Sequence, residues 1–250
     1  RTDSSAASDV YKRQGFVHTA PAHGVDDFNV CTNENIEVVN PISMNNCFKE
    51  DVGIFSGTHV RKVDPIVLEE LEKKNCLIHS ENYHHSYPHC WRHKTPLIFM
   101  ATPQWFISMT KSGLIDGANR AIQDVKFIPE WGKERMEIML KDRPDWCISR
   151  QRDWGIPIPL FFESESGELH PEQNEIFNKA SEAIKKTGID SWKNLELGVD
   201  DKGFEKSKDI FDVWFDSGIT HYCVMDERFG SNTQADLYLE GSDQHRGWFQ

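Results

Sequence analysis

Residues 236–250 read Asp-Leu-Tyr-Leu-Glu-Gly-Ser-Asp-Gln-His-Arg-Gly-Trp-Phe-Gln, and this stretch decides the expected fold. An apolar strand would end at Glu240, and Gly241 would allow the backbone to turn tightly. Ser242 or Asp243 would then cap a helix that starts at this turn. A strand that leads through a polar loop into a helix is typical of an open α/β sheet.

The predicted helix would carry an amide and an aromatic ring on one face. Gln244 and Trp248 are four residues apart, so they would project one turn above the other. With the carboxylate of Asp243 and a helix N-terminus, which favours phosphate, they would form a site for a nucleotide or an amino acid. A simpler interpretation stays open, in which Asp243 is only a cap and Trp248 only a core residue.

A second pattern, Asp209-Ile-Phe-Asp-Val-Trp-Phe-Asp-Ser-Gly218, predicts a strand with two different faces. Alternate side chains of a strand share a face, which would place Asp212, Trp214 and Asp216 together. A tryptophan between two carboxylates suits a face that opens on a polar crevice. Trp214 would line an apolar side-chain pocket there, and plain packing of the ring is the alternative.

Other segments alternate between helical and strand-like patterns. Helices are predicted over 63–74, 131–141 and 172–186, the first with Asp64 as its cap and Pro65 as its first residue. Strands are predicted over 36–39, 96–101, 105–109, 146–149, 210–215 and 236–240. Because several strands run into polar loops at their carboxyl ends, we expect an α/β fold with a ligand crevice at those ends.

The loop at residues 15–28 holds two histidines, His18 and His23, and the adjacent carboxylates Asp26 and Asp27. Such a loop could bind a metal or a cationic group, although its spacing matches no metal motif. An adjacent pair of aspartates in a loop is often only a turn.

The histidine-rich stretch 80–93 contains Cys90 and His93 at the spacing of zinc ligands. A zinc knuckle needs a second ligand pair, which the remaining cysteines do not supply, so packing and hydrogen bonding are the expected uses.

The stretch 145–159 contains the predicted strand 146–149, which is followed by Arg150, Gln151, Arg152 and Trp154. Arginines beside an aromatic ring suit phosphate and single-stranded RNA. Ordinary ion pairs on an exposed loop are an equal alternative.

Composition limits the class of protein. The 250 residues have a net charge of −12, which argues against a free-standing nucleic-acid-binding module. No apolar run approaches the ~20 residues of a membrane helix, and no secretory pattern opens the chain, so a cytoplasmic protein is expected. The six cysteines include no C-x-x-C pair and suit reduced thiols.

Six stretches, in order, closely resemble the isoleucyl-tRNA synthetases of bacterial type, which are class I enzymes. The stretches are His18–Asp27 (HTAPAHGVDD), Tyr87–Pro96 (YPHCWRHKTP), Ala101–Phe106 (ATPQWF), Asp145–Arg152 (DWCISRQR), Asp212–Gly218 (DVWFDSG) and Leu239–Trp248 (LEGSDQHRGW). They fall within residues 15–250, which the resemblance covers.

The resemblance implies a domain organisation. Residues 88–250 would be the second half of a Rossmann-type catalytic domain with an insertion at about 160–208. Residues 15–87 would be the C-terminal part of an inserted, β-rich editing domain. Residues 1–14 match nothing in the family and are expected to be a tail or an artefact.

The resemblance also implies site residues. The aminoacyl-adenylate would contact Glu240, Gly241, Asp243 and Gln244, and Trp214 and Trp248 would line the isoleucine pocket. The editing site would include His18, Thr19, His23 and Asp27, with Asp27 holding the ammonium group of the misattached amino acid and His18 helping to position it. No catalytic residue and no metal ligand is assigned within the chain.

The implied reaction joins isoleucine to ATP, with Mg²⁺, and transfers the aminoacyl group to tRNA(Ile). One methylene is worth only ~1–3 kcal/mol in an apolar pocket, so hydrolytic editing removes valine, a problem for which this family is the usual illustration. The resemblance implies that tRNA(Ile), isoleucine and ATP are the partners, that no membrane is involved, and that the parent enzyme is a monomer.

Departures from the family pattern limit these expectations. The ATP-handling motifs H-I-G-H and K-M-S-K-S are absent from the 250 residues, so the isolated chain is expected to be inactive. Some members bind zinc in this region through two cysteine pairs, but here His93 replaces one cysteine and the other pair is missing, which argues against zinc. A valyl or leucyl relative and a non-catalytic, synthetase-derived binding protein stay open as alternatives.

Overall fold

The structure is a computed structural model that describes residues 18–141, 143–164, 166–196, 198 and 202–249. The expected tail at 1–14 and residues 15–17 of the first loop lie outside these residues. The chain divides into two compact units, Arg1–Pro103 and Gln104–Gln250. No helix within the described residues has the length and apolar character needed to cross a membrane.

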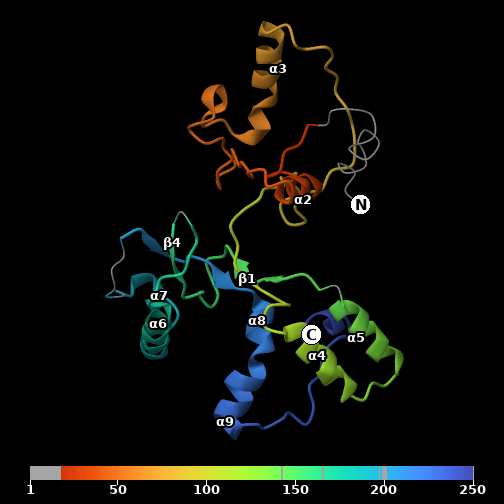
Figure 1. Cartoon of the computed structure of the whole chain (residues 1–250), viewed down its shortest axis with the longest axis vertical. Helices are drawn as coiled ribbons and strands as arrows, with labels where there is room; N and C mark the ends of the chain where they lie inside the picture. Colours follow the sequence, from red (N-terminus) through yellow and green to blue (C-terminus); the bar gives the residue numbers. More distant parts are fainter. Residues whose placement is uncertain (1–17, 142, 165, 197, 199–201, 250) are drawn as a thin grey trace. The chain divides into compact units, whose positions relative to one another are not determined.

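In the described part of the first unit, α-helices α2 (Val25–Asn33) and α3 (Asp64–Lys73) are joined by irregular chain (Figure 1). Single 3-10 turns lie at Gly53–Phe55 and Val60–Lys62. The strands predicted at 36–39 and 96–101 are wrong, because these residues form no ladder. Within the described part of this unit, β-pairing is limited to isolated bridges such as Ile42–Phe48, so the β-rich character expected here is not observed.

Helix α3 forms where the sequence predicts it. Its apolar stripe of Ile66, Val67 and Leu71 is half-buried, and proline stands in its first turn. The predicted cap is wrong: the N-cap is Val63, and no side chain caps the helix. Asp64 is instead the first helical residue, where its negative charge favours the helix dipole.

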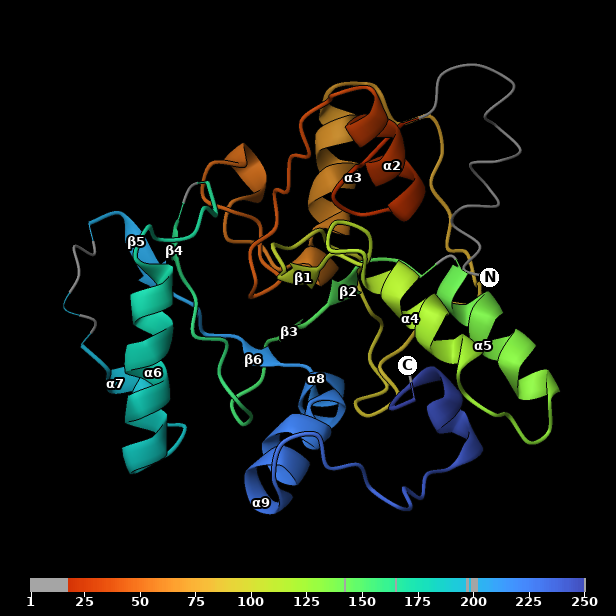
Figure 2. The same cartoon turned by 60° about the horizontal axis from the view of Figure 1, so that its bottom comes forward.

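The second unit begins with strand β1 (Phe106–Ile107) and a helical hairpin. α4 (Leu114–Gln123) and α5 (Trp131–Lys141) lie side by side (Figure 2). Ile122, Met136 and Leu140 form a buried cluster between them. Helix α5 confirms the predicted bounds, because its apolar residues recur at helical spacing.

All strand pairs in the described residues are antiparallel, and each sheet has two strands. The pairs are β1 (Phe106–Ile107) with β2 (Trp146–Cys147), β3 (Ser149–Arg150) with β6 (Ile210–Phe211), and β4 (Phe161–Glu163) with β5 (Phe204–Lys206). The open sheet with a crevice at its carboxyl ends is therefore not formed within this part of the chain. The mixture of helices and small sheets is consistent with the α/β class.

The described residues between β4 and β5 form a small packed layer. α6 (Gln173–Thr187) and the short α7 (Ser191–Asn194) cover the β4–β5 pair, and Ile176 and Ala180 of α6 are fully buried against Phe161 and Trp192. Helix α6 confirms the prediction over 172–186 to within one residue at each end.

The C-terminal part is helical where strands were predicted. Only Ile210 and Phe211 of the predicted strand 210–215 are extended, and α8 (Val213–Gly218) follows. A π-helical turn at His221–Asp226 and α9 (Glu227–Phe229) continue it. The strand predicted over 236–240 is absent, and the helix after Gly241 is a single 3-10 segment, Ser242–Arg246.

Candidate functional site

Helix α8 carries Trp214 and begins at a side-chain cap. The backbone N–H of Trp214 donates to Oδ1 of Asp212 at 3.1 Å, so Asp212 is the N-cap. This cap corrects the predicted strand, because residues on a helix are ~100° apart and Asp212, Trp214 and Asp216 do not share one face. Trp214 is 42% exposed, so its ring is available to a ligand.

Asp212 is the centre of a buried polar network. Its Oδ2 accepts from Nη2 of Arg150 at 2.6 Å and from the indole N–H of Trp146 at 3.2 Å. Nη1 of Arg150 donates to the carbonyl oxygens of Cys147 and Ser149 at 2.9 and 2.8 Å. Arg150 therefore fixes α8 to the β2–β3 segment and is engaged within the protein, which favours the ion-pair alternative over phosphate binding for this arginine.

Asp216 lies one turn after Asp212 on α8. Burial, and then the negative charge of Asp212, raise the pKa of the Asp216 carboxyl. Its Oδ1 is buried and has no hydrogen-bond partner among the described residues. The fold therefore disfavours the charged form of this side chain.

Trp214, Gln244 and Trp248 come together although the local structure differs from the prediction. The backbone N–H of Trp248 donates to Oε1 of Gln244 at 3.2 Å. A Cβ added at Gly247 would lie 3.6 Å from the Trp214 ring and 2.2 Å from Oε1 of Gln244. Only a residue without a side chain allows the Gln244 amide to approach the backbone this closely, whereas the ring distance is an ordinary contact.

The Trp248 indole is held by two residues that the sequence patterns did not indicate. Tyr238 stacks on it with 3.7 Å between ring centroids and 12° between planes. The indole N–H donates to the carbonyl oxygen of Ser217, the neighbour of Asp216 on α8, at 3.1 Å. The only sequence signal for this role of Tyr238 is that it is an aromatic residue ten positions before Trp248.

Glu240, Gly241 and Asp243 precede this cluster and are exposed. The predicted cap is wrong here too, because Gly241 is the N-cap and no side chain caps the segment. Oδ2 of Asp243 instead accepts from the amide of Gln244 at 3.2 Å. The polar groups therefore face solvent next to the aromatic pair.

In the first unit, the predicted loop leads into a helix that was not expected. Asp26 and Asp27 lie in the first turn of α2, so they do not belong to a loop turn. Oδ2 of Asp27 accepts from the backbone N–H of Ala20 at 2.9 Å, and a Cβ added at Gly24 would lie 3.4 Å from the same oxygen. This contact folds the loop over the start of the helix.

His23 is fixed from the other side of this loop. Its Nδ1 lies 2.9 Å from the carbonyl oxygen of Phe99, which can only accept, so Nδ1 carries the proton in the neutral ring. Nε2 is buried and has no hydrogen-bond partner within the described part of the chain. His18 and Thr19 are exposed at the start of the same loop.

Cys90 and His93 interact directly. Sγ lies 3.5 Å from Nδ1 of His93, and the backbone N–H of His93 donates to it at 3.4 Å. The backbone N–H groups of His93 and then Arg92 lower the pKa of the Cys90 thiol. Among the described residues, no three His, Cys, Asp or Glu side chains are grouped so that they could hold a metal ion.

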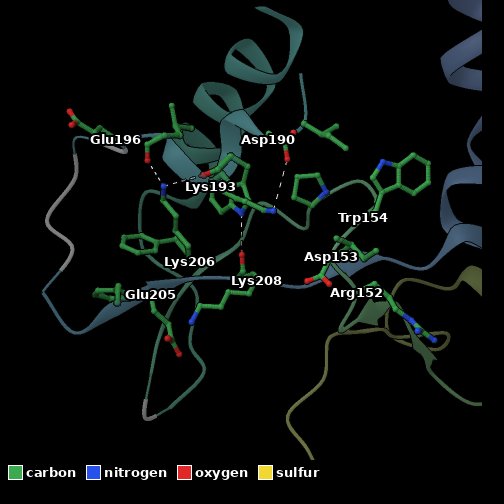
Figure 3. A pocket seen from close by; sticks show the side chains of 18 of the residues that line it. Arg152, Asp153, Trp154, Asp190, Lys193, Glu196, Glu205, Lys206 and Lys208 are labelled. Carbon is green, nitrogen blue, oxygen red and sulfur yellow. Dashed lines mark hydrogen bonds and ion pairs between the residues drawn. The ribbon is translucent and has the colours of Figure 1, made fainter. Parts of the chain in front are cut away.

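A cavity of about 1100 Å³ lies beside the β4–β5 pair (Figure 3). Its walls carry equal numbers of acidic and basic side chains: Asp153, Asp190, Glu196 and Glu205, and Arg152, Lys193, Lys206 and Lys208. Nζ of Lys206 donates to the carbonyl oxygens of Trp192, at 3.2 Å, and Leu195. None of the residues expected to bind amino acid or adenylate lines this cavity. The cavity is therefore separate from Trp214, Gln244 and Trp248, which we call the Trp214–Trp248 cluster.

Residues 8–250 match the family described as tRNA synthetases class I (I, L, M and V). The chain is 55% identical over 240 residues to the isoleucine–tRNA ligase of Marinomonas sp. (strain MWYL1). The matched residues are 94% of this chain and 26% of that relative. It is 54% identical to the enzyme of the same name from Idiomarina loihiensis and 51% identical to that from Alcanivorax borkumensis, each covering 94% of the chain. The chain thus spans about a quarter of the length of the curated relatives it matches.

Proposed function

The chain belongs to the class I tRNA synthetases of the I, L, M and V type, and on this premise we propose that it is part of an isoleucine–tRNA ligase. The observation that carries the proposal is the identity of more than 50% to isoleucine–tRNA ligases over 94% of the chain. The parent enzyme activates isoleucine with ATP and Mg²⁺ and transfers it to tRNA(Ile).

Within that enzyme, residues 88–250 are the second half of the Rossmann-type catalytic domain, with an insertion at about 160–208. Residues 15–87 are the C-terminal part of the editing domain. The packed layer between β4 and β5, with its own buried cluster, supports the insertion.

The Trp214–Trp248 cluster is the amino-acid side of the synthetic site. The two indoles present apolar surface of the kind that an isoleucine side chain needs, and Gln244 lies between them and the exposed Asp243. Glu240, Gly241, Asp243 and Gln244 contact the aminoacyl-adenylate, for which the exposure of the first three leaves room.

The loop of His18, Thr19, His23 and Asp27 is one wall of the editing site. Asp27 uses Oδ2 on the Ala20 N–H, and its carboxylate keeps lone pairs for an ammonium group. Nε2 of His23, which bears the lone pair in the neutral ring, is a second acceptor on the same loop.

Amino-acid-dependent pyrophosphate exchange by the full-length parent tests the proposal. Isoleucine should support faster exchange than valine or leucine at equal concentration. Preferential exchange with valine or leucine would transfer the assignment to those relatives. A parent that exchanges with none of the three would favour a non-catalytic binding protein.

The 250-residue chain should show no isoleucine-dependent exchange by itself.

Replacing Trp214 by alanine in the parent should raise the KM for isoleucine and leave the KM for ATP unchanged, because the ring contributes only apolar surface. An effect of equal size on both constants would contradict the assigned role of Trp214.

A further inference from the structure

An extended segment of the first unit exposes a regular row of rings. Every second residue from 83 to 91 is aromatic or histidine, and we call Tyr83, His85, Tyr87, His89 and Trp91 the aromatic ladder. Successive ring centroids lie 5.7, 5.7 and 6.4 Å apart from Tyr83 to His89. This spacing is close to the ~6.6 Å two-residue repeat of an extended chain, so the rings from Tyr83 to His89 stand on one side of the backbone. Trp91 follows them at the start of a turn.

The ladder is open to solvent. All five of its residues are exposed, and Tyr83 and Trp91 are 77% and 76% exposed. The segment is the golden trace that leaves α3 in Figure 1. Tyr83 and Trp91 therefore keep most of their surface open to another molecule, and Tyr87 keeps 43% of its surface open.

The charge of this segment differs from that of the whole chain. Residues 78–96 contain one carboxylate, Glu81, against Arg92, Lys94 and five of the eleven histidines, whereas the chain carries −12. The guanidinium of Arg92 lies 5.0 Å from the centre of the Trp91 ring, so a cation stands at the end of the ladder. Exposed ring faces beside cations are the features that single-stranded nucleic acids recognise.

We propose that the aromatic ladder binds single-stranded RNA, with bases stacked on its rings and phosphates near Arg92 and Lys94. The inference deepens the proposed function and rests on it, because that function supplies an RNA substrate. A duplex does not suit this surface, since its bases are already stacked inside the helix and cannot reach the rings.

Fluorescence anisotropy with the full-length parent tests the proposal. The probe is a labelled, mixed-sequence RNA of about ten nucleotides, compared with the same RNA annealed to its complement. The single strand should bind at least tenfold more tightly than the duplex. Replacing both Tyr83 and Tyr87 by leucine, which keeps apolar bulk but removes the rings, should weaken binding about tenfold or more.

Two further variants separate stacking from loss of structure. Changing both tyrosines to phenylalanine keeps the rings and should preserve affinity within about twofold. Tyr222→Leu, at a tyrosine that is 63% exposed in the second unit, should leave affinity unchanged. Equal binding of duplex and single strand, no binding of either, or equal weakening by the leucine and phenylalanine pairs would overturn the proposal.

The RNA-binding result is independent of amino-acid activation. The parent could exchange pyrophosphate with isoleucine while its ladder variants bind RNA as tightly as the wild type. That result would refute this inference and leave the proposed enzyme function intact. Loss of exchange in the parent with intact RNA binding would instead count against the proposed enzyme function.

Discussion

Arg150 and Asp212 are 62 residues apart in the chain, yet they form an ion pair with 2.6 Å between Nη2 and Oδ2. The Asp212 side chain is 8% exposed, so this contact is shielded from water on the carboxylate side. The same aspartate caps α8, which carries Trp214. The pair therefore fixes β3 relative to α8, the helix that carries Trp214 of the proposed isoleucine pocket.

Replacing Asp212 by alanine should lower the free energy of unfolding by about 2–4 kcal/mol, because it removes a helix cap and a charged, buried acceptor. Asp212→Asn should cost less, since its amide oxygen still caps the helix. The midpoint of urea unfolding measures both. The control is Asp153→Ala, at an exposed carboxylate in the loop after β3, which should change the free energy of unfolding by less than about 0.5 kcal/mol. If Asp153→Ala and Asp212→Ala lowered this free energy equally, the proposed role of the Asp212 network would be contradicted.

Replacing Tyr238 by leucine in the parent should raise the KM for isoleucine about two- to tenfold, because the stacked ring fixes the Trp248 indole. Tyr238→Phe keeps the stack and should behave as the wild type. Pyrophosphate exchange at varied isoleucine gives the constants, and the KM for ATP is the internal control. The role of stacking is refuted if phenylalanine is as harmful as leucine.

Gly247→Ala should impair isoleucine activation in the parent more than it impairs stability. Its Cβ would lie 2.2 Å from Oε1 of Gln244, so the amide must move away from its present position. Gly218→Ala is the matched control, because a Cβ at Gly218 meets no atom within 4 Å. Thermal melting should be similar for the two variants, whereas kcat/KM for isoleucine should fall only for Gly247→Ala.

Asp216→Asn should stabilise the chain at neutral pH. Burial and Asp212 raise the folded-state pKa of the Asp216 carboxyl above its unfolded value of ~3.9. The unfolded state then binds fewer protons, so the wild type loses stability as the pH rises through this window. The advantage of asparagine should be present at pH 7 and disappear as the pH falls towards ~3.9, as urea midpoints across this range would show. An advantage that does not change with pH would rule out titration of Asp216 as its cause.

Cys90 should react with iodoacetamide faster than the exposed Cys76 and Cys223 at neutral pH, because donors from His93 and Arg92 lower the pKa of its thiol and increase the thiolate fraction. Mass spectrometry of peptides after brief alkylation measures the three rates. Denaturation in urea removes the donors and should abolish the difference. Equal rates in the folded chain would show that these N–H groups do not activate the thiol.

The sequence predicted the helices better than the strands. Helices α5 and α6 have apolar residues at a spacing that only a helix can bury, so their bounds follow from the pattern. The strand predicted over 210–215 stops at Phe211, because the Asp212 side chain caps a helix that an alternating apolar pattern does not reveal. Short strands such as Ser149–Arg150 depend on a partner some 60 residues away, which local patterns cannot identify.

The assignment of a site to these residues stays a prediction, and the structure shows only how they are held together. Trp214, Gln244 and Trp248 do lie together, but a short helix and a 3-10 segment hold them, where a strand and an α-helix were expected. Arg150 fixes α8 through Asp212 from 62 residues away in the chain, and Tyr238 stacks on Trp248 across a turn. Such contacts depend on packing, which composition and periodicity do not encode.

The pairing of β4 with β5 has a consequence for how this region can change. Glu163 lies opposite Phe204, so the segment between them leaves and rejoins the unit at one point. Phe161, Ile176, Ala180 and Trp192 give that segment a core of its own. Residues could therefore be added between α7 and β5 without shifting the register of Ser149 against Phe211. This hairpin is the natural place at which to graft a tag, a reporter or a second domain onto the protein.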